Sequence, residues 1–305
     1  TLDIIDKDIV IGMLQSLSQK TYNMKEFESF GLSIYDECHH LSAEVFSNAM
    51  TKIVTKHTLG LSGTMNRKDG LSKVFKMFIG PVIHKEISKK DIEVLVKGIY
   101  FNNSDEEFNE VLLDYRGNTA YSSMISKICN FNIRSEFILN VLENELRLNN
   151  NQQIMILAHN KNLINYLFSA INHRNLCTVG YYVGGMKETE LKSSESKKVI
   201  IGTYAMASEG LDIKTLTTLI MATPKTDVCQ SVGRILRSKH NCPLVIDIID
   251  THIVFKNQWK KRLKYYQGQN YKIITTDETK YDKNIWNSVV DKNKKNYKKK
   301  CLISI

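Results

Sequence analysis

The chain has 305 residues, of which 42% are hydrophobic and 24% charged, and its formal net charge is +10. This length and apolar content are enough for two ordinary domains with buried cores, and no apolar run approaches the roughly 18 residues of a membrane span. The first residues lack the plan of a signal peptide. The basic balance favours a polyanionic partner, although many basic proteins bind no nucleic acid.

Short apolar runs alternate with amphipathic stretches along the chain, a pattern typical of an α/β fold with a mainly parallel sheet. Strands are expected within the apolar runs 8–13, 32–35, 58–62, 154–158, 178–183, 199–203, 218–222 and 244–248. Helices are expected where apolar residues recur with helical spacing, at 135–148, 161–171, 227–237 and 253–266. The polar, irregular region 98–134 separates the two groups of strands and is interpreted as a connector with a small insertion.

Both ends of the sequence carry signals about its extent. The chain starts without an initiating Met and almost inside a strand, so we expect an upstream part to be absent. Near the other end, eight lysines and two aspartates lie between Lys280 and Lys300, with Trp286 and Tyr297 among them. A solvated disordered tail and a segment that grips nucleic acid both fit this composition.

The first candidate site follows the run 32–35. Asp36 and Glu37 come directly after this expected strand, and α/β folds bind their ligands at the carboxyl ends of parallel strands. Asp36 would hold the Mg²⁺ that bridges nucleotide phosphates, and Glu37 would orient or deprotonate the attacking water. Because an acidic pair after a strand also occurs for structural reasons, the pair alone does not decide the chemistry.

The strongest candidate is the segment 230–237, with the sequence Q-S-V-G-R-I-L-R. Gln230, Arg234 and Arg237 fall on one face of the expected helix, whereas the other face is apolar. Two forked guanidinium groups one turn apart suit a triphosphate whose negative charge grows in the transition state. An amphipathic helix with two surface arginines is the structural alternative.

Two further strand ends carry small polar residues. The run 58–62 leads into Ser62 and Thr64, and the run 199–203 ends at Thr203, which Gly210 and Asp212 follow. Loops of this kind bind phosphates through main-chain N–H groups and short hydroxyls, contacts that do not read sequence. Gly210 would permit a tight turn, and Asp212 could reach a ribose or the arginines.

In their order, these segments resemble motifs II to VI of the superfamily 2 helicases. The sequence 36–39 matches the D-E-x-H form of motif II, and motifs III to VI correspond to 62–64, 156–160, 200–213 and 230–237. The strings 8–18, 67–71, 180–186 and 255–258 narrow the resemblance to the DExH helicases of nucleocytoplasmic large DNA viruses. That group is similar to the poxviral transcript-release helicase and, more distantly, to the XPB-like DNA translocases.

The resemblance implies a helicase or translocase that uses ATP and Mg²⁺ and acts on DNA or RNA. It implies two RecA-like parallel-sheet domains, the first incomplete, with the nucleotide between the acidic pair and the arginines. The expected division is an ATP-binding domain within 1–98, a connector at 99–134, a helicase C-terminal domain at 135–268 and a basic tail at 269–305.

The same resemblance assigns roles to individual residues. The catalytic and nucleotide-binding residues would be Asp36, Glu37, His39, Gly210, Asp212, Gln230, Arg234 and Arg237. Ser62 and Thr64 would couple the nucleotide state to domain closure. The nucleic-acid track would include Gln15, Ser16, His159, Asn160, Gly184, Gly185 and Thr203.

One motif of the group has no match in this sequence. The phosphate-binding loop G-x-x-x-x-G-K-[ST] is absent, because none of the 15 glycines is followed by Lys. Three hypotheses follow: a fragment or split-gene product whose phosphate loop lies in another segment or chain, a non-hydrolysing nucleic-acid-binding protein, and the motor of a restriction-type translocase. On the first hypothesis, this chain alone should hydrolyse very little ATP.

The six cysteines are scattered and form no C-x-x-C pair. This spacing argues against a disulfide framework or a zinc site and favours a reducing intracellular compartment. For a viral protein, that compartment would be the virion, the host cytoplasm or a virus factory. No membrane association is expected.

Overall fold

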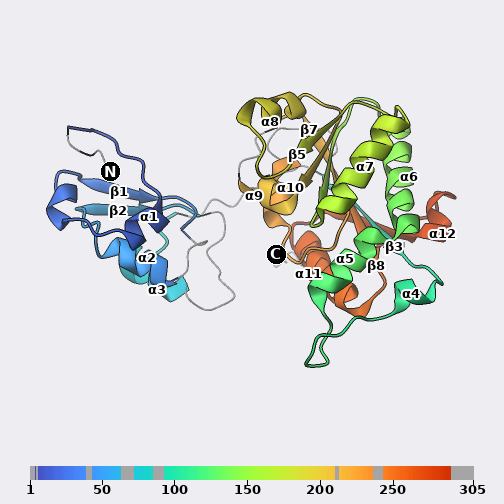
Figure 1. Cartoon of the computed structure of the whole chain (residues 1–305), viewed down its shortest axis with the longest axis horizontal. Coiled ribbons are helices and arrows are strands. Elements are labelled where there is room, and N and C mark those ends of the chain that lie inside the picture. Colours follow the sequence, from blue (N-terminus) through green and yellow to red (C-terminus); the bar gives the residue numbers. More distant parts are fainter. Residues whose placement is uncertain are drawn as a thin grey trace, which may run out of the picture. The chain divides into compact units, whose positions relative to one another are not determined.

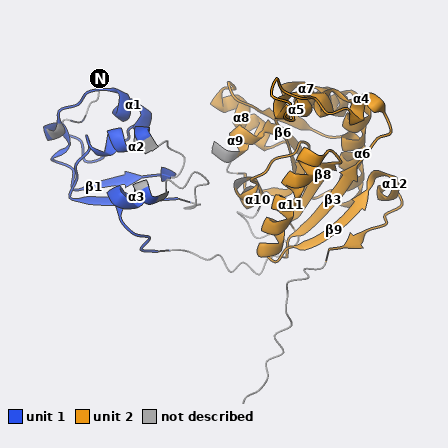
Figure 2. Ribbon diagram, turned by 90° about the horizontal axis from the view of Figure 1, so that it is seen from below, with its two compact units in different colours: residues 1–89 blue, residues 90–305 orange. Residues whose placement is uncertain are grey.

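The computed structural model describes residues 4, 6–38, 43–62, 72–84, 93–209, 213–235 and 243–289. The chain forms two compact units, Thr1–Lys89 and Lys90–Ile305, and each contains its own sheet (Figure 1, Figure 2). Each unit is described by itself. Among the described residues, no helix combines the length and apolar character needed to cross a bilayer.

Unit 1 contains a two-stranded parallel sheet with short helices. Its elements are α1 (Leu14–Gln19), η1 (Met24–Phe27), β1 (Leu32–Tyr35), α2 (Ala43–Met50), β2 (His57–Gly60) and α3 (Ser72–Ile79). The two strands run in register from Leu32 opposite His57 to Tyr35 opposite Gly60. Small apolar clusters hold the helices in place, one around Tyr35 and Met50 and another around Leu17.

The strand expected within 8–13 does not form. Residues 9–13 have no regular structure, and helix α1 begins at Leu14. Ile9 and Ile11 are 82% and 96% exposed. Within the described part of unit 1 the sheet holds only β1 and β2, so this apolar run has no strand with which to pair its main-chain groups.

Unit 2 is built on an eight-stranded sheet with the order β10-β9-β3-β8-β7-β4-β6-β5. All neighbouring strands are parallel except β10, which is antiparallel to β9. The strands are β3 (Leu95–Phe101), β4 (Gln153–Ala158), β5 (Val179–Tyr182), β6 (Val199–Thr203), β7 (Leu216–Met221), β8 (Leu244–Asp250), β9 (Lys272–Asp277) and β10 (Asn287–Ser288).

Helices cover both faces of this sheet. They are α4 (Glu106–Asn109), α5 (Tyr121–Asn130), α6 (Asn132–Leu148), α7 (Lys161–His173), α8 (Glu188–Glu195), α9 (Tyr204–Glu209), α10 (Cys229–Ile235), α11 (Ile253–Gly268) and α12 (Glu278–Tyr281). Helices α5, α6 and α7 pack on one face, and α9, α10 and α11 pack mainly on the other (Figure 2). Along β4, Ile154 and Ile156 join the first cluster whereas Met155 and Leu157 join the second, as the two-residue strand period requires.

The structure differs from the expected division of the chain. Strand β3 lies inside the large sheet, between β8 and β9, and the unit boundary falls at Lys89 rather than near residue 98. The expected connector 99–134 belongs to unit 2, because α5 contributes Met124 and Ile128 to the core. Strands β9 and β10 likewise place 272–288 of the expected tail in the sheet. In the sequence of these segments, the many polar residues obscure the few buried ones, so their place in the sheet domain depends on tertiary packing.

Candidate functional site

In unit 1, the two segments expected to act together lie at one edge of the sheet. Asp36 and Glu37 follow β1, and Leu61 and Ser62 follow the neighbouring parallel strand β2. Main-chain hydrogen bonds join the two strand ends, since Leu61 N donates to Tyr35 O (2.8 Å) and Cys38 N donates to Leu61 O (3.2 Å). The segment after β2 is therefore in direct contact with the acidic segment.

The acidic pair is exposed and sits in a strained turn. Glu37 has a φ of +45°, a conformation that few non-glycine residues adopt, and its N–H donates to Asp36 Oδ1 (2.9 Å). Close packing confines this strand end: a Cβ added to Gly60 would lie 2.8 Å from Ile79 Cδ1. Exposed carboxylates on a constrained turn can bind a cation that carries a phosphate ligand.

The expected nucleic-acid residues of unit 1 lie on α1. Gln15 and Ser16 are both exposed on this short helix. Lys52 closes the end of the helix, because its Nζ donates to Leu17 O (3.2 Å), Ser18 O (2.7 Å) and Lys20 O (2.7 Å). A cation at the carboxyl end of a helix satisfies its last carbonyls and stabilises its dipole.

In unit 2, register brings the expected nucleic-acid residues to the carboxyl edge of the sheet. Ala158 at the end of β4 pairs with Thr203 at the end of β6, and Tyr182 of β5 pairs with Gly202. His159 therefore lies beside Thr203, one strand from the loop that carries Gly184 and Gly185. The loop approaches α9, since a Cβ added to Gly184 would lie 4.0 Å from Met206 Sδ.

Glycine and asparagine shape the loops at this edge. Gly185 has a φ of +90°, which side-chain-bearing residues rarely adopt, and a Cβ there would meet open space. Asn160 is the N-cap of α7, and its Oδ1 accepts from Asn162 N (2.7 Å). The side chain of Asn160 therefore has a structural partner within the chain, whereas the Gly184–Gly185 loop leaves its main chain accessible to a ligand.

His159 is held as a neutral imidazole. Its Nδ1 lies 2.9 Å from Thr223 Oγ1, its main-chain N–H donates to the same oxygen (3.0 Å), and its ring centre is 4.6 Å from that of Tyr204. Desolvation on this side of the ring, together with the charge of Lys225, lowers the pKa of His159 to about 4. A neutral ring can contact nucleic acid through hydrogen bonding or stacking and adds no charge of its own.

Lys225 is the residue at this edge that the motif reasoning missed. Its Nζ lies 4.8 Å from the ring centre of Tyr204, whose hydroxyl donates to Thr223 O (2.6 Å). Burial lowers the pKa of Lys225, while Asp227 opposes the shift. No carboxylate among the described residues forms an ion pair with Lys225. A partly desolvated cation with an aromatic partner and no ion-paired counter-ion favours binding of an anion.

A buried ion pair fixes the segment that carries Lys225. Arg262 on α11 donates to both oxygens of Asp247 on β8, with Nε–Oδ2 and Nη2–Oδ1 distances of 2.7 and 2.8 Å. Its Nη1 donates to the main-chain oxygen of Lys225 (2.6 Å), and Tyr266 also donates to Asp247 (3.2 Å). A charged residue inside the apolar run of β8 was the signal in the sequence that could have revealed this anchor.

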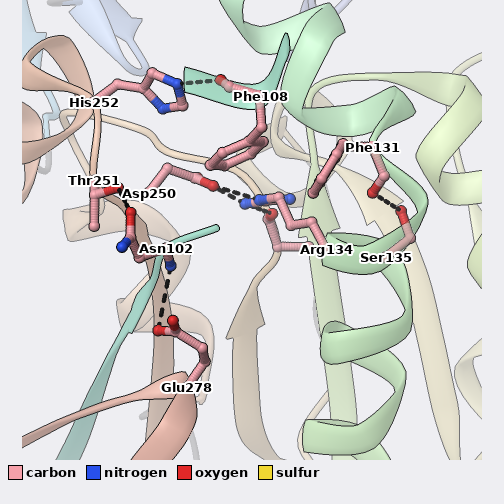
Figure 3. A network of polar contacts seen from close by, with 10 residues as sticks. Asn102, Phe108, Phe131, Arg134, Ser135, Asp250, Thr251, His252 and Glu278 are labelled. Carbon is pink, nitrogen blue, oxygen red and sulfur yellow. Dashed lines mark hydrogen bonds and ion pairs between the residues drawn. The ribbon is translucent and has the colours of Figure 1, made fainter. Parts of the chain in front are cut away.

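A second buried pair holds the neighbouring strand ends (Figure 3). Arg134 at the start of α6 donates to both oxygens of Asp250 at the end of β8 (2.5 and 2.8 Å) and to Ala222 O (2.8 Å). Both charged side chains are fully buried. Arg134 and Asp250 thereby join the ends of β7 and β8, so buried ion pairs hold the strand ends near Lys225.

Comparisons with known proteins identify the chain's relatives. Residues 3–67 match the family described as type III restriction enzyme, res subunit. A protein of Acanthamoeba polyphaga mimivirus, named as an ATP-dependent RNA helicase, is 38% identical over 308 residues, which cover 97% of this chain and 57% of that protein. The chain is a relative of viral superfamily 2 helicases. An African swine fever virus protein with the same kind of name is 25% identical to this chain. The match covers 89% of this chain and 57% of the viral protein.

Solved structures show the same fold. The structure of S. cerevisiae Dbp5 bound to RNA and ADP BeF3 matches this chain with a TM-score of 0.52 and 12% sequence identity. The match covers 84% of this chain and 62% of the Dbp5 chain. The predicted α/β fold with mainly parallel sheets is confirmed. So is the resemblance to helicases of large DNA viruses. The chain spans less than two thirds of the length of these relatives.

Several predicted site residues of this chain are described only in part or lie outside the described residues. Gln230 and Arg234 lie on α10, four residues apart and hence on one side of the helix, but their side chains are outside the described residues. Ser231 and Val232 of the same helix are buried. The remaining predicted residues outside the described part are His39, Thr64, Gly210, Asp212 and Arg237.

Proposed function

We propose that this chain is the part of an ATP-dependent nucleic-acid motor that carries motifs II to VI. The observation that supports the proposal most strongly is the carboxyl edge of unit 2. There, three separate motifs meet: His159, Thr203 and the Gly184–Gly185 loop lie at the ends of adjacent strands. Lys225, anchored by buried ion pairs, adds a cation to the same edge. This is the chemistry of a phosphate-backbone track, which needs cations, hydroxyls and accessible main chain.

ATP and Mg²⁺ are the cofactors that the proposal requires. In the described residues, no three carboxylate, His or Cys side chains gather to form a metal site. A single exposed carboxylate, Asp36, fits Mg²⁺, which is usually held by one or two carboxylates together with nucleotide phosphates. Bound Mg²⁺ neutralises charge on the transferred phosphoryl group. Glu37 orients or deprotonates the attacking water beside it.

Motifs V and VI contribute further residues to the proposed nucleotide chemistry. Gln230, Arg234 and Arg237 would contact the phosphates, with Gly210 and Asp212 near the ribose. The guanidinium groups of Arg234 and Arg237 would stabilise the negative charge that grows in the transition state. The hydrogen bonds between Leu61 and the Tyr35–Cys38 segment support the proposed coupling role of Ser62 and Thr64.

The test joins this chain to a segment that carries a G-x-x-x-x-G-K-[ST] loop. The joined protein should hydrolyse ATP faster in the presence of nucleic acid, and the 305-residue chain alone should show negligible turnover. Glu37→Gln should abolish turnover but retain ATP binding, because the amide keeps the shape of the carboxylate and cannot act as a base. Turnover that survives Glu37→Gln refutes the assigned role, and turnover by the chain alone refutes the need for the loop.

A motor that translocates on duplex DNA without unwinding it is the second candidate. The match of residues 3–67 to the type III restriction enzyme res subunit favours it. The joined protein separates the two candidates in parallel assays with a labelled duplex and a labelled triplex. Release of a strand from the duplex supports a helicase, whereas release of only the third strand from the triplex supports a translocase. A protein that binds nucleic acid in both assays but never hydrolyses ATP is a non-hydrolysing binder.

A further inference from the structure

A short hairpin, 112–119, projects from unit 2 between α4 and α5 (Figure 1). Leu113 and Thr119 form an antiparallel bridge, Asp114 N donates to Asn118 O (2.7 Å), and Ala120 N donates to Leu112 O (2.8 Å). This hairpin belongs to none of the helicase motifs. It lies within 99–134, the region expected from the sequence to be a connector.

The turn of the hairpin is fixed by an aspartate and a glycine. Asp114 Oδ1 accepts from Arg116 N (2.8 Å) and from Asn118 N (2.9 Å), and Asp114 O accepts from Gly117 N (3.0 Å). Gly117 has a φ of +77°, which glycine adopts without strain. The tip therefore has a set shape, and the carboxylate of Asp114 is occupied within the turn.

The tip presents an aromatic ring and a guanidinium to solvent. Tyr115 is 87% exposed, and Arg116 is exposed beside it with Cζ 5.0 Å from the centre of the tyrosine ring. An aromatic side chain on a protruding, ordered tip contributes almost nothing to the core. A single exposed ring is common on protein surfaces, but here it lies beside a guanidinium on a fixed turn, and this pair of groups can stack on a base and bind its phosphate.

The segments on both sides of the hairpin are anchored in unit 2. Before the hairpin, the main-chain oxygen of Phe108 lies 2.7 Å from His252 Nε2, and Lys127 Nζ donates to Glu110 O (2.8 Å). On the other side, Tyr121 follows the hairpin directly, and its hydroxyl donates to Pro224 O (3.2 Å). Pro224 precedes Lys225, so the base of the hairpin is bonded to the segment that carries the cation of the proposed nucleic-acid edge.

We propose that the 112–119 hairpin is a base-stacking element for single-stranded nucleic acid. Tyr115 stacks on an unpaired base, and Arg116 contacts the adjoining phosphate. This inference rests on the proposed function and adds to it a contact with the bases. Ring stacking is independent of base identity, as a motor that moves along any sequence requires. Three or four extended residues from base to tip span about 10 Å, roughly the reach from a backbone track to its neighbouring bases.

Two features favour nucleic acid over a protein partner: the hairpin adjoins the proposed nucleic-acid edge, and its tip is positively charged. The hairpin starts from the same edge that bears His159, Thr203 and Lys225. Its single acidic residue, Asp114, is engaged in the turn, so the tip presents the positive charge of Arg116 without a competing carboxylate. A flat ring beside a guanidinium suits a base and its phosphate.

The first experiment uses fluorescence of the 305-residue chain with Tyr115→Trp. A 12-nucleotide single-stranded oligonucleotide should quench the new tryptophan, because stacking on a base quenches indole emission. Wild-type protein gives the background from Trp259 and Trp286. Tyr166→Trp on α7 is the matched control, since Tyr166 is a partly exposed tyrosine that bonds Glu136 and lies outside the hairpin. Quenching in the Tyr115 variant alone supports the proposal, and equal responses from both variants overturn it.

The second experiment measures affinity for the same oligonucleotide. Tyr115→Ala should weaken binding about 5- to 100-fold, and Tyr115→Phe should bind like the wild type, because stacking needs the ring and not the hydroxyl. Arg116→Ala should reduce the slope of log affinity against log salt by the amount of about one phosphate contact. Arg147→Ala removes the same charge at the end of α6, near the amino edge of the sheet, and should change neither quantity.

The outcomes separate this inference from the proposed function. If the wild type binds single strands and Tyr115→Ala binds equally well, the stacking role is wrong while the backbone track stands. If the wild type binds no nucleic acid, both ideas fail. Because Tyr115 is exposed, its variants should melt at the wild-type temperature. A lowered melting temperature together with wild-type affinity would show that the ring serves folding and would overturn the proposal.

Discussion

Lys225→Met tests the backbone track most directly, because the variant keeps the length of the stem and removes only the charge. The structure predicts opposite effects on stability and on binding. Lys225 is partly desolvated, has no ion pair among the described residues and gains only a cation–π contact with Tyr204. Such a contact contributes about 1 kcal/mol, and relief of desolvation offsets it, so the free energy of unfolding should change by less than about 1 kcal/mol.

The expected loss of binding follows from counter-ion release. One phosphate contact on single-stranded nucleic acid contributes about 0.7 to the slope of log affinity against log salt. At 0.1 M salt this corresponds to about a five-fold loss of affinity, which should shrink towards zero at 1 M salt. The assay is fluorescence anisotropy with a labelled oligonucleotide over this range of salt. Lys225→Arg retains the charge and should retain most of the slope.

Lys272→Met is the charge-matched control. Lys272 is an exposed lysine at the start of β9, on the amino edge of the same sheet, so its loss should leave the slope unchanged. An unchanged slope in Lys225→Met, or an equal decrease in both variants, would refute the reasoning, because binding would then respond to net charge and not to this edge.

Two further predictions concern the same edge. In an NMR titration, His159 should stay neutral down to about pH 4. Its pKa is lower in the folded than in the unfolded chain, so its contribution to stability is present above about pH 6.5. That contribution is lost as the pH falls towards about 4. A midpoint near 6.5 would show that the His159 ring is neither buried at this edge nor close to the charge of Lys225. Arg262→Met should cost about 3–5 kcal/mol in urea unfolding of unit 2, because it leaves Asp247 charged and buried. The double variant with Asp247→Leu should recover much of that loss, and an equally unstable double variant would contradict the charge argument.

The carboxyl edge of unit 2 explains how unrelated stretches of sequence produce one surface. Each βα connection of a parallel sheet delivers its first loop residues to the same edge. His159 and Thr203 are 44 positions apart in the chain, yet their strands pair directly. Two fully buried ion pairs then brace the ends of β7 and β8 and the segment that carries Lys225. For the proposed motor, such bracing would favour binding of a polyanion, since contacts made by preorganised groups lose less entropy on binding.

Much of this protein can be predicted from the order of its residues alone. The apolar run 199–203 matches β6 residue for residue, because strands buried on a parallel sheet need continuous apolar sequence. The run 32–35 matches the bounds of β1, although Leu32 and Ile34 are exposed there. The motifs are also local: Asp36, Thr203 and Arg234 are recognisable from their immediate neighbours. The helicase relationship follows from such strings, because phosphate chemistry constrains short stretches of chain at fixed positions after strands.

Tertiary structure decides what depends on partners distant in the chain. The run 8–13 has the composition of a strand, but no described strand of unit 1 pairs with it. Lys225 looks like an ordinary surface lysine until Tyr204 and Arg262 are placed around it, and the hairpin at 112–119 looks like an irregular linker until Tyr121 reaches Pro224. Local sequence encodes periodicity and motif chemistry, whereas a charge loses its hydration only when segments distant in the chain pack around it.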